Sequence, residues 1–328
     1  MLRGSTVVVT LLVALAALGV GAASAQQARP YHVVFVGSAP PPVERWDAFR
    51  ATLRESGWME GKDLSITVRA GPLERADELA REVIAKRADV IVAAYTAWGL
   101  ALRRATTTIP VVLVGSGYPV EVGLAASMRR PGGNVTGNTI YGGVELFGKY
   151  LQLFHEVAPS MTRLGVLWDY APPAFPDAQI ALDELDRAAR SKAVTLRVHL
   201  VRNAADLSGA LAALASEQVH GLLVTSGFVN LPARERIVEF ATRNRLPSMS
   251  DYRWPHPHPL LLVYSADPHE LYRRAATFVD RILRGANAGD LPIEQPTKFE
   301  LLINLRTAKS LGVTIPPALL FRADQLIE

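Results

Sequence analysis

The segment DVIVAAYTAWGLALRRATTTIPVVLV, residues 89–114, contains two short apolar runs with a helical pattern between them. The runs 89–93 and 109–114 are apolar without alternation, which is typical of strands buried on both faces. Residues 97–105 lie between the two runs and predict a helix. A strand, a helix and a second strand in this order form a βαβ unit, in which the two strands are parallel.

The same alternation extends from this segment in both directions. Upstream, strands are predicted at 31–36 and 64–68, with helices at 46–57 and 73–86. Downstream, a second series has expected strands at 163–168, 194–200, 219–225, 246–249 and 260–264, and expected helices at 177–191, 204–216, 234–243 and 267–284. A chain of this length favours two cores over one. We therefore predict an α/β fold of two doubly wound parallel-sheet lobes joined by a hinge.

The glycine-rich segment MRRPGGNVTGNTI, residues 128–140, lies at the passage from the first series to the second. We interpret it as an inter-lobe crossing or its approach, with Gly137, Asn138 and Thr139 as hinge residues that absorb backbone rotation. A phosphate loop is a weaker interpretation, because Asn138 stands where that motif has a lysine. Asn134-Val-Thr136 is a formal glycosylation sequon, a pattern that is common by chance.

The first 25 residues have the pattern of a secretory signal peptide. Arg3 precedes an apolar run at residues 6–20, and Ala23-Ser-Ala25 matches the small-x-small cleavage pattern, so the mature chain is expected to start at Gln26. The alternative is a membrane anchor, but the apolar run is shorter than the roughly 20 residues that a spanning helix needs.

The composition excludes several classes of protein. The chain has no cysteine, which rules out disulfides and thiolate metal sites. Its net charge is +4, from 35 basic and 31 acidic residues, and no basic run is interleaved with aromatic residues. We therefore expect no nucleic-acid partner.

Ligands of doubly wound sheets bind outside the carboxyl ends of the strands, so the candidate binding residues are those that follow predicted strands. A ligand carboxylate is best held by N–H groups and hydroxyls at the start of a helix. Tyr95, Thr96 and Ala97 stand at such a start, although Thr96 is equally well explained as a helix cap. Ser38 follows the first strand and Tyr118 follows the fourth strand of the first lobe.

The second lobe offers candidates of the same kind. Trp168, Asp169 and Tyr170 end its first strand and provide ring faces and a carboxylate, although an aromatic residue there is often only packed under a loop. The remaining candidates are Thr225, Ser226, Asp251 and Asp267. Asp251 and Asp267 could each pair with a ligand amine, but helix capping is the simpler explanation of Asp267.

Nothing in the sequence indicates catalysis. It has no G-x-S-x-G nucleophile elbow, and no G-x-G-x-x-G follows the first strand. The segment Pro255-His-Pro-His-Pro259 is better explained as a rigid exposed loop than as a metal site. We therefore expect a protein that is not an enzyme and that binds neither a metal nor a cofactor.

Several segments resemble one known family. They are AFRATLRESGWMEG (48–61), RRATTTIPVVLV (103–114), GLAASMRRPGGNVTG (123–137) and the C-terminal run from Leu271 to Glu328, which includes EQPTKFEL. The chain closely resembles the ABC transporter substrate-binding proteins of the tryptophan/tyrosine-binding type, over essentially the whole mature chain. The resemblance implies a type I periplasmic binding protein.

The resemblance also implies how the protein is organised and where it works. Lobe 1 would comprise residues 26–138 plus about 266–287, and lobe 2 residues 139–265 plus about 288–328. The protein would be a periplasmic monomer that captures a small molecule, an aromatic amino acid or a related compound, for a membrane permease driven by a cytoplasmic ATPase. The alternative is a sensor that presents its closed form to a membrane receptor.

One position departs from the family pattern. The family usually has an acidic residue before the proline of the segment Val114-Gly-Ser-Gly-Tyr-Pro119, and this chain has Tyr118 there. An acidic partner for a ligand amine is therefore expected to be missing at this position. That leaves room for an aromatic carboxylate or another neutral or anionic solute.

Overall fold

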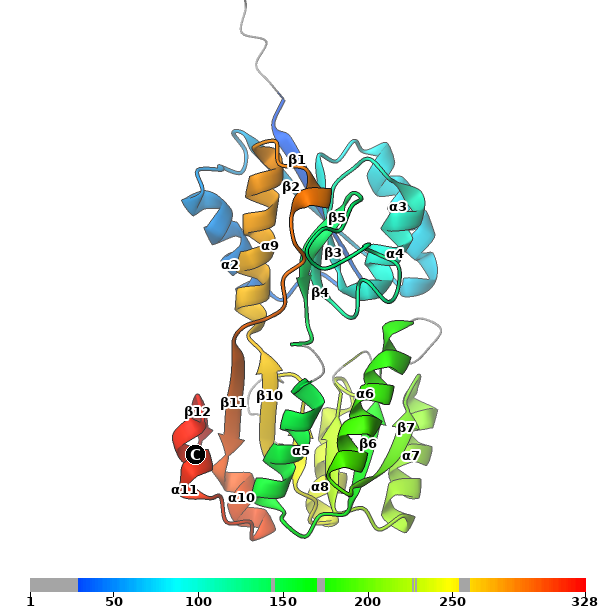
Figure 1. Cartoon of the computed structure of the whole chain (residues 1–328), viewed down its shortest axis with the longest axis vertical. Helices are drawn as coiled ribbons and strands as arrows, with labels where there is room; N and C mark the ends of the chain where they lie inside the picture. Colours follow the sequence, from blue (N-terminus) through cyan, green and yellow to red (C-terminus); the bar gives the residue numbers. More distant parts are fainter. Residues whose placement is uncertain (1–28, 143–144, 170–174, 226, 228, 254–259) are drawn as a thin grey trace, which may run out of the picture.

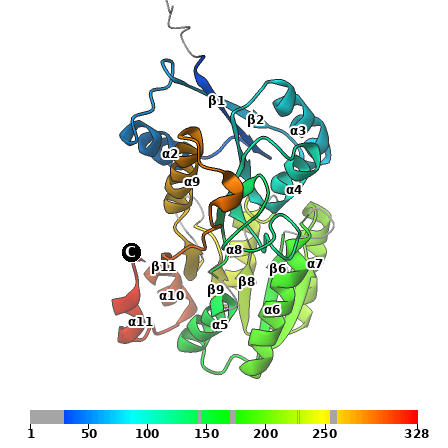
Figure 2. The same ribbon diagram turned by 45° about the horizontal axis from the view of Figure 1, so that its top comes forward.

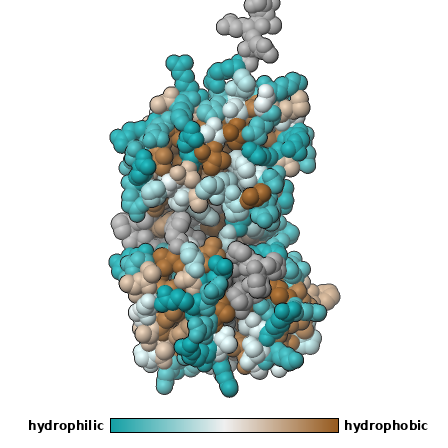
Figure 3. All heavy atoms as spheres, turned by 180° about the vertical axis from the view of Figure 1, so that it is seen from behind, coloured by the Kyte–Doolittle hydropathy of each residue, from teal (hydrophilic) through white to brown (hydrophobic). Residues whose placement is uncertain are grey.

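The computed structural model describes residues 29–142, 145–169, 175–225, 227, 229–253 and 260–328. These residues form two α/β lobes that are stacked along the long axis of the molecule (Figure 1). The predicted signal peptide, residues 1–25, lies outside the described residues. Seen from behind, both lobes have a largely hydrophilic surface on which apolar residues occur in small groups (Figure 3).

Lobe 1 is built on a five-stranded sheet in which every pair of neighbouring strands is parallel. Its strand order is β2-β1-β3-β4-β5, and the strands are β1 (Tyr31–Gly37), β2 (Leu64–Ala70), β3 (Val90–Ala94), β4 (Val111–Ser116) and β5 (Val135–Thr139). The central strands β3 and β4 are buried along their whole length, as their continuous apolar sequence predicts.

Helices cover both faces of this sheet, as a doubly wound fold requires. α2 (Val43–Glu55) and α9 (Pro268–Leu283) pack on one face, and α3 (Ala76–Ala85) and α4 (Tyr95–Ala105) pack on the other. α9 returns from the far end of the chain, and its apolar face contributes Leu271, Ala275 and Phe278 to the core of lobe 1.

Lobe 2 is built on a seven-stranded sheet of order β12-β11-β10-β9-β8-β6-β7. The strands are β6 (Arg163–Trp168), β7 (Thr195–Leu200), β8 (Gly221–Val224), β9 (Ser248–Ser250), β10 (Leu262–Ala266), β11 (Phe299–Asn304) and β12 (Gln325–Ile327). β11 runs antiparallel to β10, which departs from the purely parallel sheet that the sequence predicts. The reason is that the chain re-enters lobe 2 from lobe 1 along β11.

Helices also cover both faces of the second sheet. The core on one face contains residues of α5 (Glu145–Val157), α6 (Asp177–Ser191), α10 (Leu305–Leu311) and α11 (Pro317–Arg322). The core on the opposite face contains residues of α7 (Ala204–Ser216) and α8 (Arg234–Arg243). The helices α5, α10 and α11 were not predicted from the sequence, and neither was the strand β5.

The chain passes between the lobes after β5, between β10 and α9, and before β11 (Figure 1). The predicted hinge residues Gly137, Asn138 and Thr139 end β5, at the edge of the first sheet and just before the first of these crossings. The first and third crossings run side by side, because Glu294 N–H donates to Gly137 O (2.9 Å) and Thr139 N–H donates to Glu294 O (2.9 Å).

The position of the third crossing bears on the lobe borders. The short 3₁₀ helix Ala288–Asp290 and Leu291 belong with lobe 1, since Ala288 and Leu291 pack in its core and Thr136 Oγ1 donates to Leu291 O (2.8 Å). The return to lobe 2 therefore comes later than the expected residue 288. We propose that lobe 1 extends to about residue 293.

Asn134 does not have the exposure that a glycosylation site needs. Its side chain is buried, and Nδ2 donates to Ile109 O (2.7 Å) and Thr106 O (3.2 Å). The segment 131–134 thus packs against the loop before β4.

Candidate functional site

A pocket lies between the two lobes, where the strand ends of both sheets face each other. It encloses about 670 Å³ of space not filled by atoms, part of which is open to solvent. Its lining residues come from both lobes and from the crossings: Tyr95, Thr96, Gly115, Ile140, Tyr141, Leu146, Tyr150, Phe175, Asp177, Ala178, Asp251, Tyr252, Ala266 and Phe299.

Aromatic rings dominate the walls of the pocket. Tyr141 packs against Tyr118 at 5.2 Å between ring centroids, and Phe299 stacks on Tyr264 at 5.4 Å. Burial raises the pKa of the Tyr141 and Tyr150 hydroxyls well above its usual value, so both rings stay neutral. Such walls suit an apolar or aromatic ligand group.

Thr96 is the polar centre of the lobe 1 side. It stands in the first turn of α4 and is 1% exposed. Its hydroxyl Oγ1 accepts a hydrogen bond from Gly117 N–H (2.8 Å) and donates one to Asp177 Oδ2 (2.9 Å). The hydroxyl of Ser116 lies 3.2 Å away. Thr96 does not cap α4, as the sequence suggested it could, because the N-cap residue is Ala94 and no described side chain caps this helix; the Thr96 hydroxyl instead joins the two lobes.

Asp177 brings a carboxylate into the pocket from lobe 2. It is the first residue of α6 and is 9% exposed, and Figures 1 and 2 both show the start of α6 facing lobe 1 beside α4. Its second oxygen, Oδ1, is buried without a hydrogen-bond partner among the described residues. Burial raises the pKa of Asp177, and the hydrogen bond from Thr96 only partly opposes this.

Two further contacts join the lobes. The Tyr118 hydroxyl of lobe 1 donates to Glu184 Oε2 on α6. Arg45 on α2 donates to the Tyr252 hydroxyl of lobe 2, and its guanidinium lies 4.7 Å from the centroid of that ring. Together with the bond between Thr96 and Asp177, these contacts mean that the lobes are closed on each other.

Replacing Asp177 by asparagine should raise the thermal stability of the ligand-free protein at neutral pH. A carboxyl whose folded pKa is raised contributes stability below its unfolded pKa and loses it as pH rises through the folded value. Asparagine keeps a side-chain oxygen that can accept the hydrogen bond from Thr96. Because asparagine does not ionise, its contribution to stability does not fall as the pH rises. We expect Asp177→Asn to melt about 1–3 °C above the wild type at pH 7.5 and to lose this advantage near pH 4. An equal difference at both pH values, measured by calorimetry, would contradict this account.

The pocket brings together three of the residues predicted from the sequence. Tyr95 and Thr96 line it from lobe 1, and Asp251 lines it from the loop after β9. Tyr95 has a positive φ of 61°, a rare conformation for a residue with a side chain, at the junction of β3 and α4. Such strain is commonly found at binding sites.

Three other lobe 1 candidates lie beside the pocket without lining it. Ser38 Oγ accepts a hydrogen bond from Trp98 Nε1 (3.0 Å) and borders a separate hollow formed by Pro40, Pro41 and Pro42. Ala97 is buried and packs in the same apolar cluster as residues of α5 and α6 in lobe 2. Tyr118 packs against Tyr141, which lines the pocket, and its hydroxyl donates to Glu184 of lobe 2. Tyr118 therefore supports the pocket wall and joins the two lobes.

The candidates at the ends of β6 and β8 have structural contacts. Trp168 is 1% exposed within the core of lobe 2. Asp169 Oδ2 accepts hydrogen bonds from Val229 N–H (2.8 Å) and Asn230 N–H (2.6 Å), and Thr225 Oγ1 accepts one from Asp169 N–H (2.9 Å). These residues order the loop after β8 and do not line the pocket. Tyr170 and Ser226 lie outside the described residues.

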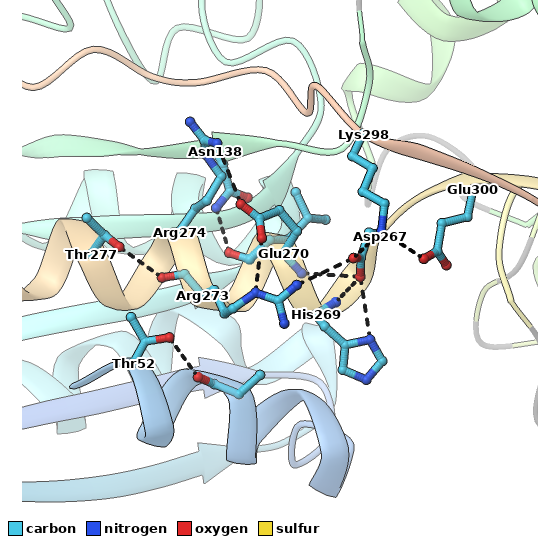
Figure 4. Close-up of polar contacts among 12 residues, drawn as sticks. Thr52, Asn138, Asp267, His269, Glu270, Arg273, Arg274, Thr277, Lys298 and Glu300 are labelled. Carbon is cyan, nitrogen blue, oxygen red and sulfur yellow. Dashed lines mark hydrogen bonds and ion pairs between the residues drawn. The ribbon is translucent and has the colours of Figure 1, made fainter. Parts of the chain in front are cut away.

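Asp267 caps α9, which is the simpler of its two explanations. Its Oδ1 accepts hydrogen bonds from His269 N–H (2.8 Å) and Glu270 N–H (3.3 Å), and Oδ2 pairs with Arg273 (3.5 Å) and Lys298 (3.6 Å) (Figure 4). Burial acts to raise the pKa of Asp267, but these hydrogen bonds and cations together lower it. The ionised carboxylate thus fixes the start of α9 at the second crossing.

Sequence reasoning missed most of the lining. Tyr141 falls in a crossing, Tyr150 and Phe299 in unpredicted elements, and Phe175 in the loop before α6. Asp177 was placed correctly at a helix start, but no local signal shows that this helix start faces the other lobe. Position 118 has a tyrosine, and Asp177 brings an acidic group to the pocket from lobe 2.

A family comparison identifies the protein class. The model of the ABC transporter substrate binding protein family matches residues 33–327. The chain belongs to this family. Substrate-binding proteins of this kind bind solutes and are not enzymes, which agrees with the absence of catalytic motifs in the sequence.

Individual relatives of this substrate-binding protein agree with that assignment. A tyrosine-binding protein of Clostridioides difficile is 23% identical over 267 residues, which are 81% of this chain and 75% of the relative. A conserved domain protein of Vibrio cholerae has a TM-score of 0.81 at 26% identity, over 91% of this chain and 100% of the other. An ABC domain from Streptococcus pneumonia, solved in complex with L-Trp, has a TM-score of 0.82 at 19% identity, over 91% and 100%.

The fold of this substrate-binding protein is that of the type I periplasmic binding proteins, with two doubly wound lobes joined by a hinge. Over the described part of the chain, no helix is both long and apolar enough to cross a membrane.

Proposed function

We propose that this protein is the periplasmic solute-binding component of an ABC uptake transporter and that it captures a small aromatic solute in the pocket between its lobes. The observation that carries the proposal is the aromatic pocket, whose lining is assembled from both lobes and the crossings. Thr96 and Asp177 join the lobes at its edge. A site divided in this way is complete only when the lobes are closed.

Closure is the step that links binding to transport in this proposal. A ligand that contacts Thr96 and Tyr95 from one side and Tyr150 and Asp177 from the other binds the closed form better than the open form. It therefore shifts the population towards closure, which a ligand of equal affinity for both forms cannot do. The outer faces of the closed lobes would then be recognised by a permease with a cytoplasmic ATPase.

Gly137, Asn138 and Thr139 would anchor the lobe 1 side of the hinge, at the end of β5. Asn138 holds the end of β5 in place, since its Oδ1 accepts a hydrogen bond from Gly115 N–H (3.0 Å) and its Nδ2 donates to Leu271 O (2.8 Å). Rotation between the lobes would then fall on the crossing residues that follow Thr139. Export by the N-terminal segment, action in the periplasm and a monomeric state belong to the same proposal.

The ligand class is proposed from the pocket walls, with support from two relatives. One relative is named for tyrosine binding and another was solved with L-Trp. In this chain Tyr141, Tyr150 and Phe299 offer ring faces to a ligand. Aromatic amino acids and their derivatives are therefore the first compounds to test.

The proposal is tested by thermal shift and small-angle X-ray scattering. The full-length gene product is expressed with its own N-terminal segment, purified from the periplasmic fraction and screened against aromatic amino acids, amines and acids. We expect at least one compound to raise the melting temperature, because it binds only the folded form. The same compound should reduce the radius of gyration. If no compound produces either effect, the proposed function is wrong.

A further inference from the structure

The charges that line the pocket are all negative. Asp177 and Asp251 line it from lobe 2, whereas no lysine, arginine or histidine is found among its described lining residues. Asp177 is buried, and a buried carboxylate needs a compensating partner, so Asp177 favours a ligand group that brings positive charge.

The position that suits a ligand carboxylate is already taken by the protein. The start of a helix with a free hydroxyl is a good anion site, and Thr96 at the start of α4 provides one. Asp177 Oδ2 occupies it, at 2.9 Å from Thr96 Oγ1. A carboxylate on the ligand would have to displace Asp177 from Thr96, and it would then meet Asp177 as a like charge.

The second oxygen of Asp177, Oδ1, needs a hydrogen-bond donor from the ligand. Oδ1 is buried and has no hydrogen-bond partner among the described residues. Asp177 lines the pocket, so a hydrogen-bond donor on a ligand can reach this carboxylate. An ammonium group supplies both the donor and the compensating charge.

The aromatic walls favour a cation for an independent reason. The faces of aromatic rings carry negative electrostatic potential and attract ammonium groups within about 6 Å of the ring centroid. Tyr141, Tyr150 and Phe175 line the same pocket as Asp177. Rings together with a carboxylate are the usual environment of a bound organic ammonium ion.

Two guanidinium groups lie in a hollow that adjoins this pocket and shares Tyr95, Asp251 and Tyr252 with it. Arg45 and Arg253 line the neighbouring hollow. Arg45 lies over the Tyr252 ring and donates to its hydroxyl. Arg253 donates to Gln325 Oε1 (2.8 Å) and lies 3.9 Å from Glu300. Both guanidinium groups therefore already have protein partners, and neither is among the residues that line the pocket with Asp177.

We propose that the ligand of this protein is a small organic cation, an amine or quaternary ammonium compound that carries no carboxylate, with its charged group against Asp177. This inference rests on the proposed function and narrows its substrate class. The inference predicts that the decarboxylated amines bind and that the amino acids with the same ring bind more weakly.

The experiment compares matched pairs of compounds by isothermal titration calorimetry at pH 7.5. The pairs are tryptamine with tryptophan, tyramine with tyrosine, and choline with glycine betaine, each of which differs chiefly by a carboxylate. We expect the member without the carboxylate to bind at least tenfold more tightly in every pair that binds. Tighter binding of the carboxylate-bearing member would overturn the inference and leave the proposed function intact. Absence of binding in all pairs would overturn the inference.

A variant tests the role of Asp177 directly. Asp177→Asn should weaken amine binding at least tenfold, while its melting temperature stays at or above that of the wild type. Asp183→Asn is the matched control, because Asp183 is an exposed residue of the same helix and its loss changes the net charge equally. Unchanged amine affinity in Asp177→Asn, or an equal loss in both variants, would overturn the inference.

Discussion

Alanine at position 117 should lower the affinity of the pocket for its ligand about a hundredfold while leaving each lobe folded. Gly117 lies where the end of β4 meets the start of α6 in the closed protein. A Cβ atom at this position would lie 2.1 Å from Asp177 Oδ2 and 3.0 Å from Tyr141 Cε2. Both distances are shorter than side chains normally allow, so the closed arrangement cannot accept a methyl group unchanged.

The size of this effect follows from what must move. Either Asp177 leaves Thr96, which loses a charge-assisted hydrogen bond of about 1.5–3 kcal/mol, or the lobes remain farther apart. Overpacking of the wall against Tyr141 costs roughly another 1 kcal/mol. Because about 1.4 kcal/mol corresponds to a tenfold change in affinity, the two costs together predict a loss near a hundredfold.

Calorimetry and scattering measure the effect of Gly117→Ala. With a compound that binds the wild type, we expect weak binding and a radius of gyration that stays close to the ligand-free value. Gly148→Ala is the control, because Gly148 lies in α5 and a Cβ there meets no atom within 4 Å. Wild-type affinity in Gly117→Ala would show that the lobes do not close as described.

Alanine at position 137 should destabilise lobe 1 by about 3 kcal/mol or more. Gly137 has a φ of 124°, a conformation that residues with side chains rarely adopt. A Cβ atom would lie 2.3 Å from Leu113 O and 2.4 Å from Leu113 N, which are backbone atoms of the central strand β4. Because this backbone is buried within the sheet, it cannot move aside as a flexible side chain can.

Urea unfolding followed by tryptophan fluorescence, to which Trp46, Trp58 and Trp98 of lobe 1 contribute, measures the loss in Gly137→Ala. We expect the transition of lobe 1 to move to lower urea concentration, and lobe 1 to be cleaved faster by protease. Gly133→Ala is the control, since a Cβ there meets no atom within 4 Å and its φ is ordinary. Equal stability of the two variants would mean that β5 can shift away from β4 at little cost.

The sequence by itself determined the class of fold and most of its elements. Apolar runs such as 90–94 and 111–114 form buried strands wherever they lie in the chain, because their period and their residue types are local properties. The same holds for the apolar face of α9, which was predicted and is found in the core. Two of the elements that were missed, β5 and α5, contain glycine and lie next to irregular crossings, which weakens the local pattern.

For the site, the sequence could indicate only residues that follow strands. That rule found Tyr95, Thr96 and Asp251, and it also selected Trp168, Asp169 and Thr225, whose contacts are with their own lobe. A strand end looks the same in the sequence whether it faces a ligand or a neighbouring loop. The rule therefore gave both groups equal weight.

The meeting of the two lobes was decided by the tertiary structure alone. Thr96 and Asp177 are far apart in the sequence, and their contact depends on how one lobe rotates against the other through the crossings. The absent acid at position 118 suggested a neutral or anionic ligand, because the sequence could not show that Asp177 reaches the pocket from lobe 2. Charge in a cleft is a sum over both of its walls, and local sequence patterns describe only one wall at a time.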